Sequence, residues 1–179
     1  MIVKQHRNVV LFIAASLDGY IATKDDSLEW LFQVDGEGDN GFAAFYETVD
    51  TVLMGKRTYD WIMEQDMQEF PYKNKQSYVF TRSSVTETEN VKFISDDVSD
   101  FIQHLKHGEG KDVWIVGGGE LLHTFLQEKL LDELILTVAP TILGDGIPLF
   151  KKGDYQLDLF LKKTKRFNQF VELHYEVKR

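Results

Sequence analysis

The stretch DVWIVGGGELLHTFLQEKL (residues 112–130) passes from an apolar, β-rich run through three consecutive glycines into a run with helical periodicity. DVWIVG (112–117) predicts a strand, and ELLHTFLQEKL (120–130) carries apolar residues at spacings of three and four, which predicts a helix. The first N–H groups of a helix have no intrahelical partner and lie at the positive end of its dipole. The glycines therefore predict either a tight strand-to-helix turn or an anion site at Gly117, Gly118 and Gly119.

The same alternation of strand and helix extends to both sides of this stretch. Further strands are predicted at 8–16, 50–55, 76–81 and 91–95, and further helices at 42–49, 56–64 and 98–107. The run 8–16 is nearly all apolar, which is typical of a strand buried on both faces of a parallel sheet. The end of the chain instead alternates apolar and polar residues around Asn168 and Gln169, which predicts an antiparallel hairpin. We therefore expect an α/β fold with a mixed, mostly parallel sheet and helices on both faces, in one domain spanning residues 1–179.

The overall composition excludes several classes of function. The 20 basic and 29 acidic residues give a formal net charge of -9 and form no basic stripe, which argues against nucleic acid and anionic membranes as partners. The chain has no cysteine, and its five histidines show no metal-ligand spacing, so we expect no metal site. Residues 1–10 lack the apolar core of a leader peptide, and no apolar run approaches the roughly 18 residues that span a membrane. We expect a soluble, cytoplasmic protein that acts on a small molecule.

A second strand end carries cations. In MGKRTYDWI (54–62) a predicted strand ends at Gly55, and the following helix begins with Lys56, Arg57 and Thr58. Cations in the first turn of a helix oppose its dipole, and a bound phosphate would explain why two occur there. The alternative is a pair of solvated surface bases.

A third strand end supplies further anion-binding groups. FTRSS (80–84) places Thr81, Arg82 and Ser83 directly after a predicted strand. Ligands of open α/β sheets bind beyond the carboxyl ends of the strands, so the three segments are expected to lie together. A dinucleotide with a pyrophosphate and a 2′-phosphate would use all three. Arg57 and Arg82 favour NADPH over NADH, because NADH sites usually place an acidic residue at the ribose.

The segment after the first strand, ASLDGYIATKDDSLEW (15–30), is expected to form a loop over this site. Asp18 would be a polar group at its mouth, with a turn-forming role as the alternative. Trp30 would cover the reacting ring, with an ordinary core position as the alternative.

Five segments carry a resemblance to a known family: SLDGYIA (16–22), SLEW (27–30), MGKRTYDWI (54–62), VGGGELL (116–122) and PTILGDGIPLF (140–150). In this order they resemble the dihydrofolate-reductase-like superfamily, and most of all the C-terminal reductase domain of bifunctional riboflavin-biosynthesis deaminase-reductases. The resemblance implies a three-layer α/β/α fold, NADPH as hydride donor, a homodimer and, from the paired glycines of dihydrofolate reductases, a cis bond between Gly117 and Gly118. The cofactor-binding residues that it implies are Ala15, Gly55, Lys56, Arg57, Thr58, Thr81, Arg82, Ser83, Val116, Gly117, Gly118, Gly119, Glu120 and Leu121.

Two departures from the family concern the substrate. Dihydrofolate reductases carry an acid four residues before a helical Phe, but those positions are Gly41 and Gly38 here, with Asp39 out of register. The riboflavin-pathway reductases carry arginines suited to a sugar phosphate where residues 31–45 have three acids and no base. We predict an NADPH-dependent reductase of a small heterocycle, of the 5-amino-6-(5-phosphoribosylamino)uracil reductase type, with Asp18 and Trp30 in the catalytic site. The alternatives are a dihydrofolate reductase and a nucleotide-binding protein without turnover.

Overall fold

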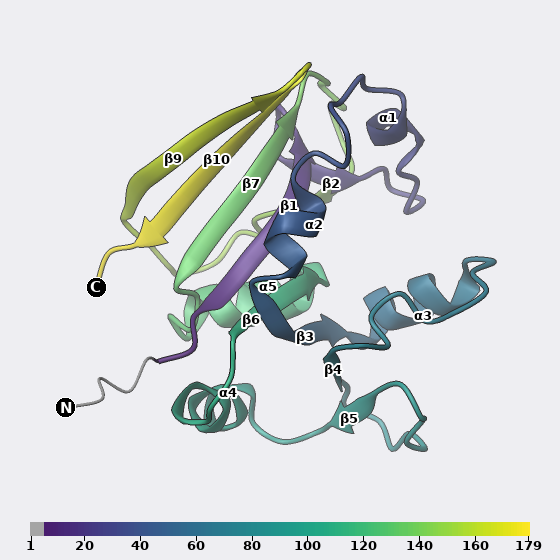
Figure 1. The fold of residues 1–179 in the computed structure, drawn as a ribbon, viewed down its shortest axis with the longest axis vertical. Helices are drawn as coiled ribbons and strands as arrows, with labels where there is room; N and C mark the ends of the chain where they lie inside the picture. The colour runs from purple at the N-terminus through teal and green to yellow at the C-terminus, as the bar shows by residue number, and fades with distance from the viewer. Residues whose placement is uncertain (1–5) are drawn as a thin grey trace.

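The protein is built around an eight-stranded mixed sheet, in a computed structural model that describes residues 6–179 (Figure 1). The strands lie in the order β5-β4-β3-β6-β1-β7-β10-β9. Strands β1 and β3 to β7 pair in parallel, whereas β10 pairs antiparallel with both β7 and β9. The bounds are β1 (Val9–Ser16), β3 (Val49–Gly55), β4 (Gln76–Phe80), β5 (Lys92–Ile94), β6 (Asp112–Gly117), β7 (Glu133–Ala139), β9 (Leu159–Phe167) and β10 (Phe170–Val177). This confirms the predicted mostly parallel sheet and its C-terminal antiparallel hairpin.

Helices cover both faces of the sheet. They are α1 (Glu29–Phe32), α2 (Phe42–Tyr46), α3 (Lys56–Glu64), α4 (Val98–His107) and α5 (Gly119–Gln127). Helices α4 and α5 contribute Ile102 and Phe125 to one hydrophobic cluster, and α2 and α3 contribute Phe45 and Ile62 to a second cluster on the opposite face. The result is the three-layer α/β/α arrangement that the resemblance implies.

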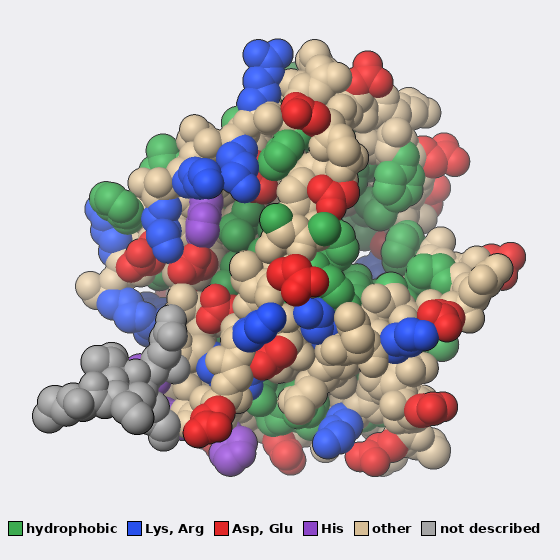
Figure 2. Space-filling view, viewed as in Figure 1, with side chains coloured by type: hydrophobic (Ala, Val, Ile, Leu, Met, Phe, Trp, Pro, Cys, Tyr) green, Lys and Arg blue, Asp and Glu red, His purple; other side chains and the backbone are tan. Residues whose placement is uncertain are grey.

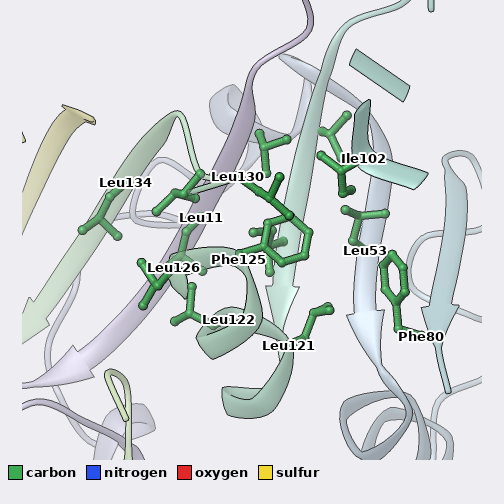
Figure 3. Close-up of a cluster of buried hydrophobic side chains, with 14 of the residues drawn as sticks. Leu11, Leu53, Phe80, Ile102, Leu121, Leu122, Phe125, Leu126, Leu130 and Leu134 are labelled. Carbon is green, nitrogen blue, oxygen red and sulfur yellow. The ribbon is translucent and has the colours of Figure 1, made fainter. Parts of the chain in front are cut away.

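The alternation of side chains along β1 explains why its sequence is almost wholly apolar. Val9 and Leu11 point into the cluster beneath α4 and α5, whereas Val10 points into the cluster beneath α2 and α3. Figure 3 shows Leu11 with Leu53 and Phe125 in the first of these clusters. The first residues of β1 are therefore buried on both faces of the sheet, whereas residues 12–14 further along the strand are only partly buried.

Two of the predicted helices are observed with their predicted bounds, and two others end earlier than predicted. The helices predicted at 56–64 and 98–107 are α3 and α4, and Asp97 caps α4 by accepting a hydrogen bond from the Asp100 N–H at 3.0 Å. The helix predicted at 42–49 ends at Tyr46, because the Thr48 hydroxyl and N–H both bond back to the carbonyl of Phe45. The helix predicted at 120–130 ends at Gln127, and Lys129 takes a left-handed conformation.

A small second sheet joins two distant segments for which the sequence predicts loops. Strand β2 (Tyr20–Ala22) pairs antiparallel with β8 (Ile147–Pro148). The Leu17 N–H also donates to the Thr141 carbonyl at 2.8 Å, and the Leu149 N–H donates to the Gly19 carbonyl at 2.9 Å. Two of the five family-like segments, 16–22 and 140–150, therefore form one unit beside the carboxyl end of β1.

Two expectations about the chain as a whole concern its first residues and membranes. The segment 1–10, for which no leader peptide is expected, begins with five residues that lie outside the described part of the chain. From residue 6 onward, no helix is long and apolar enough to cross a membrane.

Candidate active site

A cleft of about 690 Å³ opens at the carboxyl ends of the parallel strands. Its walls come from β1 and β6, from α3, from the segment that carries β2 and the start of α1, and from Ile147 of β8. In Figure 2 the recess lies at the right of the visible face, where hydrophobic side chains gather between α1 and α3. The lining residues are Ile13, Ala14, Ile21, Ala22, Asp26, Leu28, Leu31, Lys56, Arg57, Thr58, Asp60, Trp61, Ile62, Glu64, Tyr72, Val116, Gly117, Gly118, Gly119 and Ile147.

Gly117, Gly118 and Gly119 at the end of β6 form the floor of this cleft, which is called the glycine floor below. The turn at Gly55, at the end of β3, lies against it. Gly118 has φ +99°, and a methyl group placed on it would lie 3.4 Å from the Thr58 hydroxyl oxygen and 3.5 Å from the Cα of Gly55. The end of β3 and the end of β6 therefore approach each other closely, and a side chain at Gly118 would occupy the space between them. These are ordinary contact distances, so the positive φ, which residues other than glycine rarely adopt, accounts for a glycine at that position.

The expected cis bond between Gly117 and Gly118 is wrong. No cis peptide bond occurs in residues 6–179, so this bond is trans. The positive φ angles of the two glycines, +153° and +99°, turn the chain from β6 into α5 instead.

Both helices that begin at these turns lack a side-chain cap. The residues before them, Gly55 for α3 and Gly118 for α5, have no side chain that could accept a hydrogen bond from the first turn. Helix α4, which begins away from the cleft, is capped by Asp97. The two uncapped first turns therefore leave N–H groups and two positive dipole ends beside the cleft, which is the arrangement that binds phosphates.

Acidic side chains partner both cations of α3. Lys56 forms an ion pair with Asp60 at 2.5 Å, one turn along the helix. Arg57 donates from one guanidinium nitrogen to both carboxylate oxygens of Asp26 at 2.8 Å. Asp26 belongs to the turn after β2, and it also lines the cleft. A phosphate that binds Arg57 would therefore compete with Asp26.

The structure brings half of the implied cofactor residues into the cleft wall. Lys56, Arg57, Thr58, Val116 and the three glycines line it, whereas the other seven do not: Ala15, Gly55, Thr81, Arg82, Ser83, Glu120 and Leu121.

These seven residues have different surroundings. Ala15 and Leu121 are buried in the hydrophobic core. Glu120 pairs with Lys151, which holds the pKa of the Glu120 carboxyl below its usual range, with a smaller contribution from Arg82. Thr81 and Ser83 lie 3.0 Å apart through their hydroxyls at the end of β4.

Asp18 connects two loops outside the cleft wall. Its carboxylate accepts hydrogen bonds from the Ser16 hydroxyl at 2.7 Å, the Gly144 N–H at 2.8 Å and the Leu143 N–H at 3.1 Å. The bond from Ser16 lowers the pKa of Asp18 most; desolvation opposes it, and the backbone bonds from Gly144 and Leu143 lower the pKa further by smaller amounts. These contacts are those of a loop-fixing residue.

Trp30 also lies outside the cleft wall. It belongs to α1, and its indole N–H is buried without a hydrogen-bond partner among the described residues. The next residue, Leu31, does line the cleft.

The aromatic and acidic residues of the cleft were missed from sequence. Trp61 and Glu64 follow Arg57 at helical spacings of four and seven, so the periodicity of α3 could have indicated both. Tyr72 lies in the loop after α3, where no periodic signal exists. Its ring packs edge-on against Trp114 at 5.3 Å, and burial raises the pKa of its hydroxyl to about 12.

The segment 39–47 contributes no residue to the cleft wall. The carboxylate of Asp39 accepts hydrogen bonds from the N–H groups of Gly41 at 3.0 Å and Ala43 at 2.8 Å, and it is exposed. It therefore fixes the start of α2. The acid that a dihydrofolate reductase would place in this pocket wall is absent from it.

The sheet, its two helix layers and the cleft at the strand ends define an α/β/α protein of the dihydrofolate-reductase type. Dihydrofolate reductase from Enterococcus faecalis, in a complex with NADP(H), superposes with a TM-score of 0.63 at 15% identity, over 96% of this chain and 97% of that one. At this level of identity the likeness concerns the fold alone.

The chain belongs to the RibD C-terminal domain family, whose model matches residues 7–173. It is 47% identical to the Bacillus subtilis (strain 168) protein YwjB over 94% of this chain and 97% of that protein. A Shewanella sp. PV-4 protein named for riboflavin biosynthesis superposes with a TM-score of 0.86 at 33% identity, over 96% and 99% of the two chains. The Thermotoga maritima diaminohydroxyphosphoribosylaminopyrimidine deaminase/5-amino-6-(5-phosphoribosylamino)uracil reductase superposes with a TM-score of 0.71 at 16% identity, over 99% of this chain and 58% of that one.

Proposed function

We propose that the protein is an NADPH-dependent oxidoreductase that reduces a small heterocycle, of the 5-amino-6-(5-phosphoribosylamino)uracil reductase type. Membership of the RibD C-terminal domain family and the reductase named for Thermotoga maritima support this reaction class. The observation that carries the proposal is the pair of uncapped helices, α3 and α5, which begin at the floor of one cleft. Two positive helix ends beside a glycine floor suit the pyrophosphate of a dinucleotide.

The residues present fit such a cofactor. The Thr58 hydroxyl lies beside the glycine floor, and the first turns of α3 and α5 provide N–H donors for phosphate oxygens. In this proposal Arg57 and Arg82 hold the 2′-phosphate, and Ala14, Val116 and the residues around them exclude water from the nicotinamide. NADPH, when bound, supplies the hydride from its nicotinamide C4.

Asp18 and Trp30 have indirect roles in this proposal. Asp18 fixes the loop that contains Leu143 and Gly144, and that loop leads directly into β8 and the cleft residue Ile147. Trp30 precedes the cleft residue Leu31 in the short helix α1. In this proposal Trp30 keeps Leu31 in the apolar wall that covers the nicotinamide ring.

The cofactor assignment is tested by titrating NADPH and NADH against the wild type and against the Arg57→Ala/Arg82→Ala double variant, followed by protein fluorescence. We expect the wild type to prefer NADPH, and the double variant to lose most of that preference. Arg166→Ala is the matched control, because Arg166 lies on β9 and donates to the Asn168 carbonyl away from the cleft. Equal binding of NADH and NADPH by the wild type would refute the 2′-phosphate assignment.

Two alternatives to this function remain open to experiment. A dihydrofolate reductase is disfavoured because the carboxylate of Asp39 accepts hydrogen bonds from the Gly41 and Ala43 N–H groups and does not line the cleft. A binding protein without turnover would bind NADPH yet oxidise none of it with any substrate in a panel of pyrimidines, pterins and quinones. Turnover with one pyrimidine would exclude that alternative.

We further propose that the protein is a cytoplasmic homodimer that uses the hairpin of β9 and β10. Strand β9 is an edge of the sheet and exposes Phe160 and Leu161. The lysines and arginine of LKKTKR (161–166) on that edge oppose strand-to-strand pairing, so the hairpin would pack through a face. Light scattering coupled to gel filtration tests this, and a monomer at micromolar concentration would refute it.

A further inference from the structure

Helix α3 gives the cleft two electrically different ends. Its nine residues rise about 1.5 Å each, so its first and last residues lie about 12 Å apart. Lys56 and Thr58 line the cleft near the positive N-terminal end, together with the glycine floor. Trp61 and Glu64 line the cleft near the negative C-terminal end. An anionic group is therefore favoured at the first end and disfavoured at the second.

The charges along the cleft strengthen this difference. The cleft wall contains three carboxylates, from Asp26, Asp60 and Glu64, and two bases. Asp26 and Asp60 already partner the two bases in ion pairs. Glu64 forms no ion pair with any residue of the described chain from 6 to 179. The C-terminal end of α3 therefore has an uncompensated negative charge.

The remaining surface at this end is aromatic and apolar. Trp61 and Ile62 belong to the second half of α3, and Tyr72, from the loop that follows α3, lines the same cleft. The ring of Tyr72 is held edge-on by Trp114 at 5.3 Å and by Phe70 at 5.7 Å. The face of an aromatic ring attracts cations and stacks on planar heterocycles.

The bases close to this aromatic group are engaged elsewhere. Lys75 donates to the carbonyls of Tyr46 at 3.0 Å and Val49 at 2.8 Å, and it does not line the cleft. Lys73 pairs with Glu69 on the surface. Residues 31–45, which begin with the cleft residue Leu31, contain three acids and no base.

We propose that the end of the cleft formed by Trp61, Glu64 and Tyr72 takes a planar heterocyclic substrate that is neutral or positively charged and carries no phosphate. This rests on the proposed function, because it assigns the phosphates of the cofactor to the opposite end. A phosphoribosyl substrate would bring a dianion to the end that holds Glu64 and the negative helix terminus. The substrate class therefore differs from the phosphorylated pyrimidine that the resemblance implies.

The first test uses three planar probes of one size that differ in charge: benzamidinium, benzamide and benzoate. Binding is followed at pH 7 in the presence of saturating NADPH by the indole N–H signal of Trp61, which the Trp61→Phe variant identifies. We expect benzamidinium to bind about three- to tenfold more tightly than benzamide. Benzoate is expected to bind more weakly than both, and uridine to bind more tightly than uridine 5′-monophosphate.

Glu64→Gln is the decisive variant. It retains the size of the side chain and removes its charge, so the preference for benzamidinium over benzamide should fall severalfold. Glu109→Gln is the matched control, because Glu109 is an exposed acid in the loop after α4, outside the cleft wall, and should leave the preference unchanged.

The outcomes separate this inference from the proposed function. Benzoate or uridine 5′-monophosphate binding as tightly as the uncharged analogue, with NADPH binding intact, would overturn the substrate class alone. An unchanged preference in Glu64→Gln would do the same. Absence of NADPH binding to the wild type would overturn the proposed function and this inference together.

Discussion

Replacement of Gly118 by alanine is expected to have two effects, a loss of stability and a loss of affinity for NADPH. The backbone of Gly118 has φ +99° and ψ +110°, which lies outside the left-handed region that other residues tolerate. Holding an alanine in such a conformation costs about 1–3 kcal/mol. The added methyl would lie 3.4 Å from the Thr58 oxygen and 3.5 Å from the Cα of Gly55, which are ordinary contact distances. Backbone strain, and not a clash, therefore determines the loss of stability.

The second effect of Gly118→Ala concerns the cofactor. The new methyl would occupy the space between the first turns of α3 and α5, where we propose that the pyrophosphate lies. We expect the affinity for NADPH to fall at least about tenfold, which corresponds to about 1.4 kcal/mol. The melting temperature should fall by about 2–4 °C for each kcal/mol of strain.

Gly144→Ala is the control for strain alone. Gly144 also has a positive φ, +78°, but a methyl placed on it meets nothing within 4 Å. It should lose about 1–2 kcal/mol of stability and bind NADPH like the wild type. Urea denaturation measures the stability of both variants, and fluorescence titration measures NADPH binding. If Gly118→Ala lost no more affinity than Gly144→Ala, the glycine floor would not be the phosphate site.

Three further predictions follow from other contacts. Asp26→Asn frees the guanidinium of Arg57, so NADPH affinity should rise about two- to fivefold, as expected for an exposed pair worth about 0.2–1 kcal/mol; an unchanged NADPH titration would contradict the competition between Asp26 and phosphate. Asp50→Ala leaves the guanidinium of Arg7, which is 5% exposed, without its carboxylate partner, so the free energy of unfolding measured in urea should fall by about 3 kcal/mol. A loss below about 1 kcal/mol would show that Thr51 and the Lys111 carbonyl are sufficient partners for Arg7. The folded-state pKa of Tyr72 is raised from 10.0 to about 12, so its contribution to stability is complete below pH 10 and is lost as the pH rises toward 12. A late tyrosinate transition at 295 nm should therefore disappear in Tyr72→Phe, and its persistence would assign it to another tyrosine.

The elements that could be predicted from sequence are those with a strong local signal. The apolar run 8–16 became β1, and the periodic segments 56–64 and 98–107 became α3 and α4. The short elements β2, β8 and α1 were missed. Each has two to four residues, which is too few for a periodic pattern.

The candidate site was predicted in part, for a similar reason. Glycine turns and cations at helix starts are local features, so Gly118, Thr58 and Arg57 could be selected from their neighbours in the chain. Tyr72 could not, because it reaches the cleft from a loop and is held there by contacts with Phe70 and Trp114.

The local pattern of apolar, polar and glycine residues along the chain was enough to specify the class of fold and the edge of the sheet where a ligand is expected to bind. Apolar patterning repeats over a few residues, and parallel strands all end at one edge, so neither conclusion needs the strand order. The electrostatic character of the cleft needed the tertiary structure. Arg57 had the pattern of a free phosphate ligand, yet its partner Asp26 lies 31 residues away in sequence and 2.8 Å away in space. Charges interact through distance in space, so only the fold decides which cations are neutralised and which carboxylate, Glu64, is left without a partner among residues 6–179.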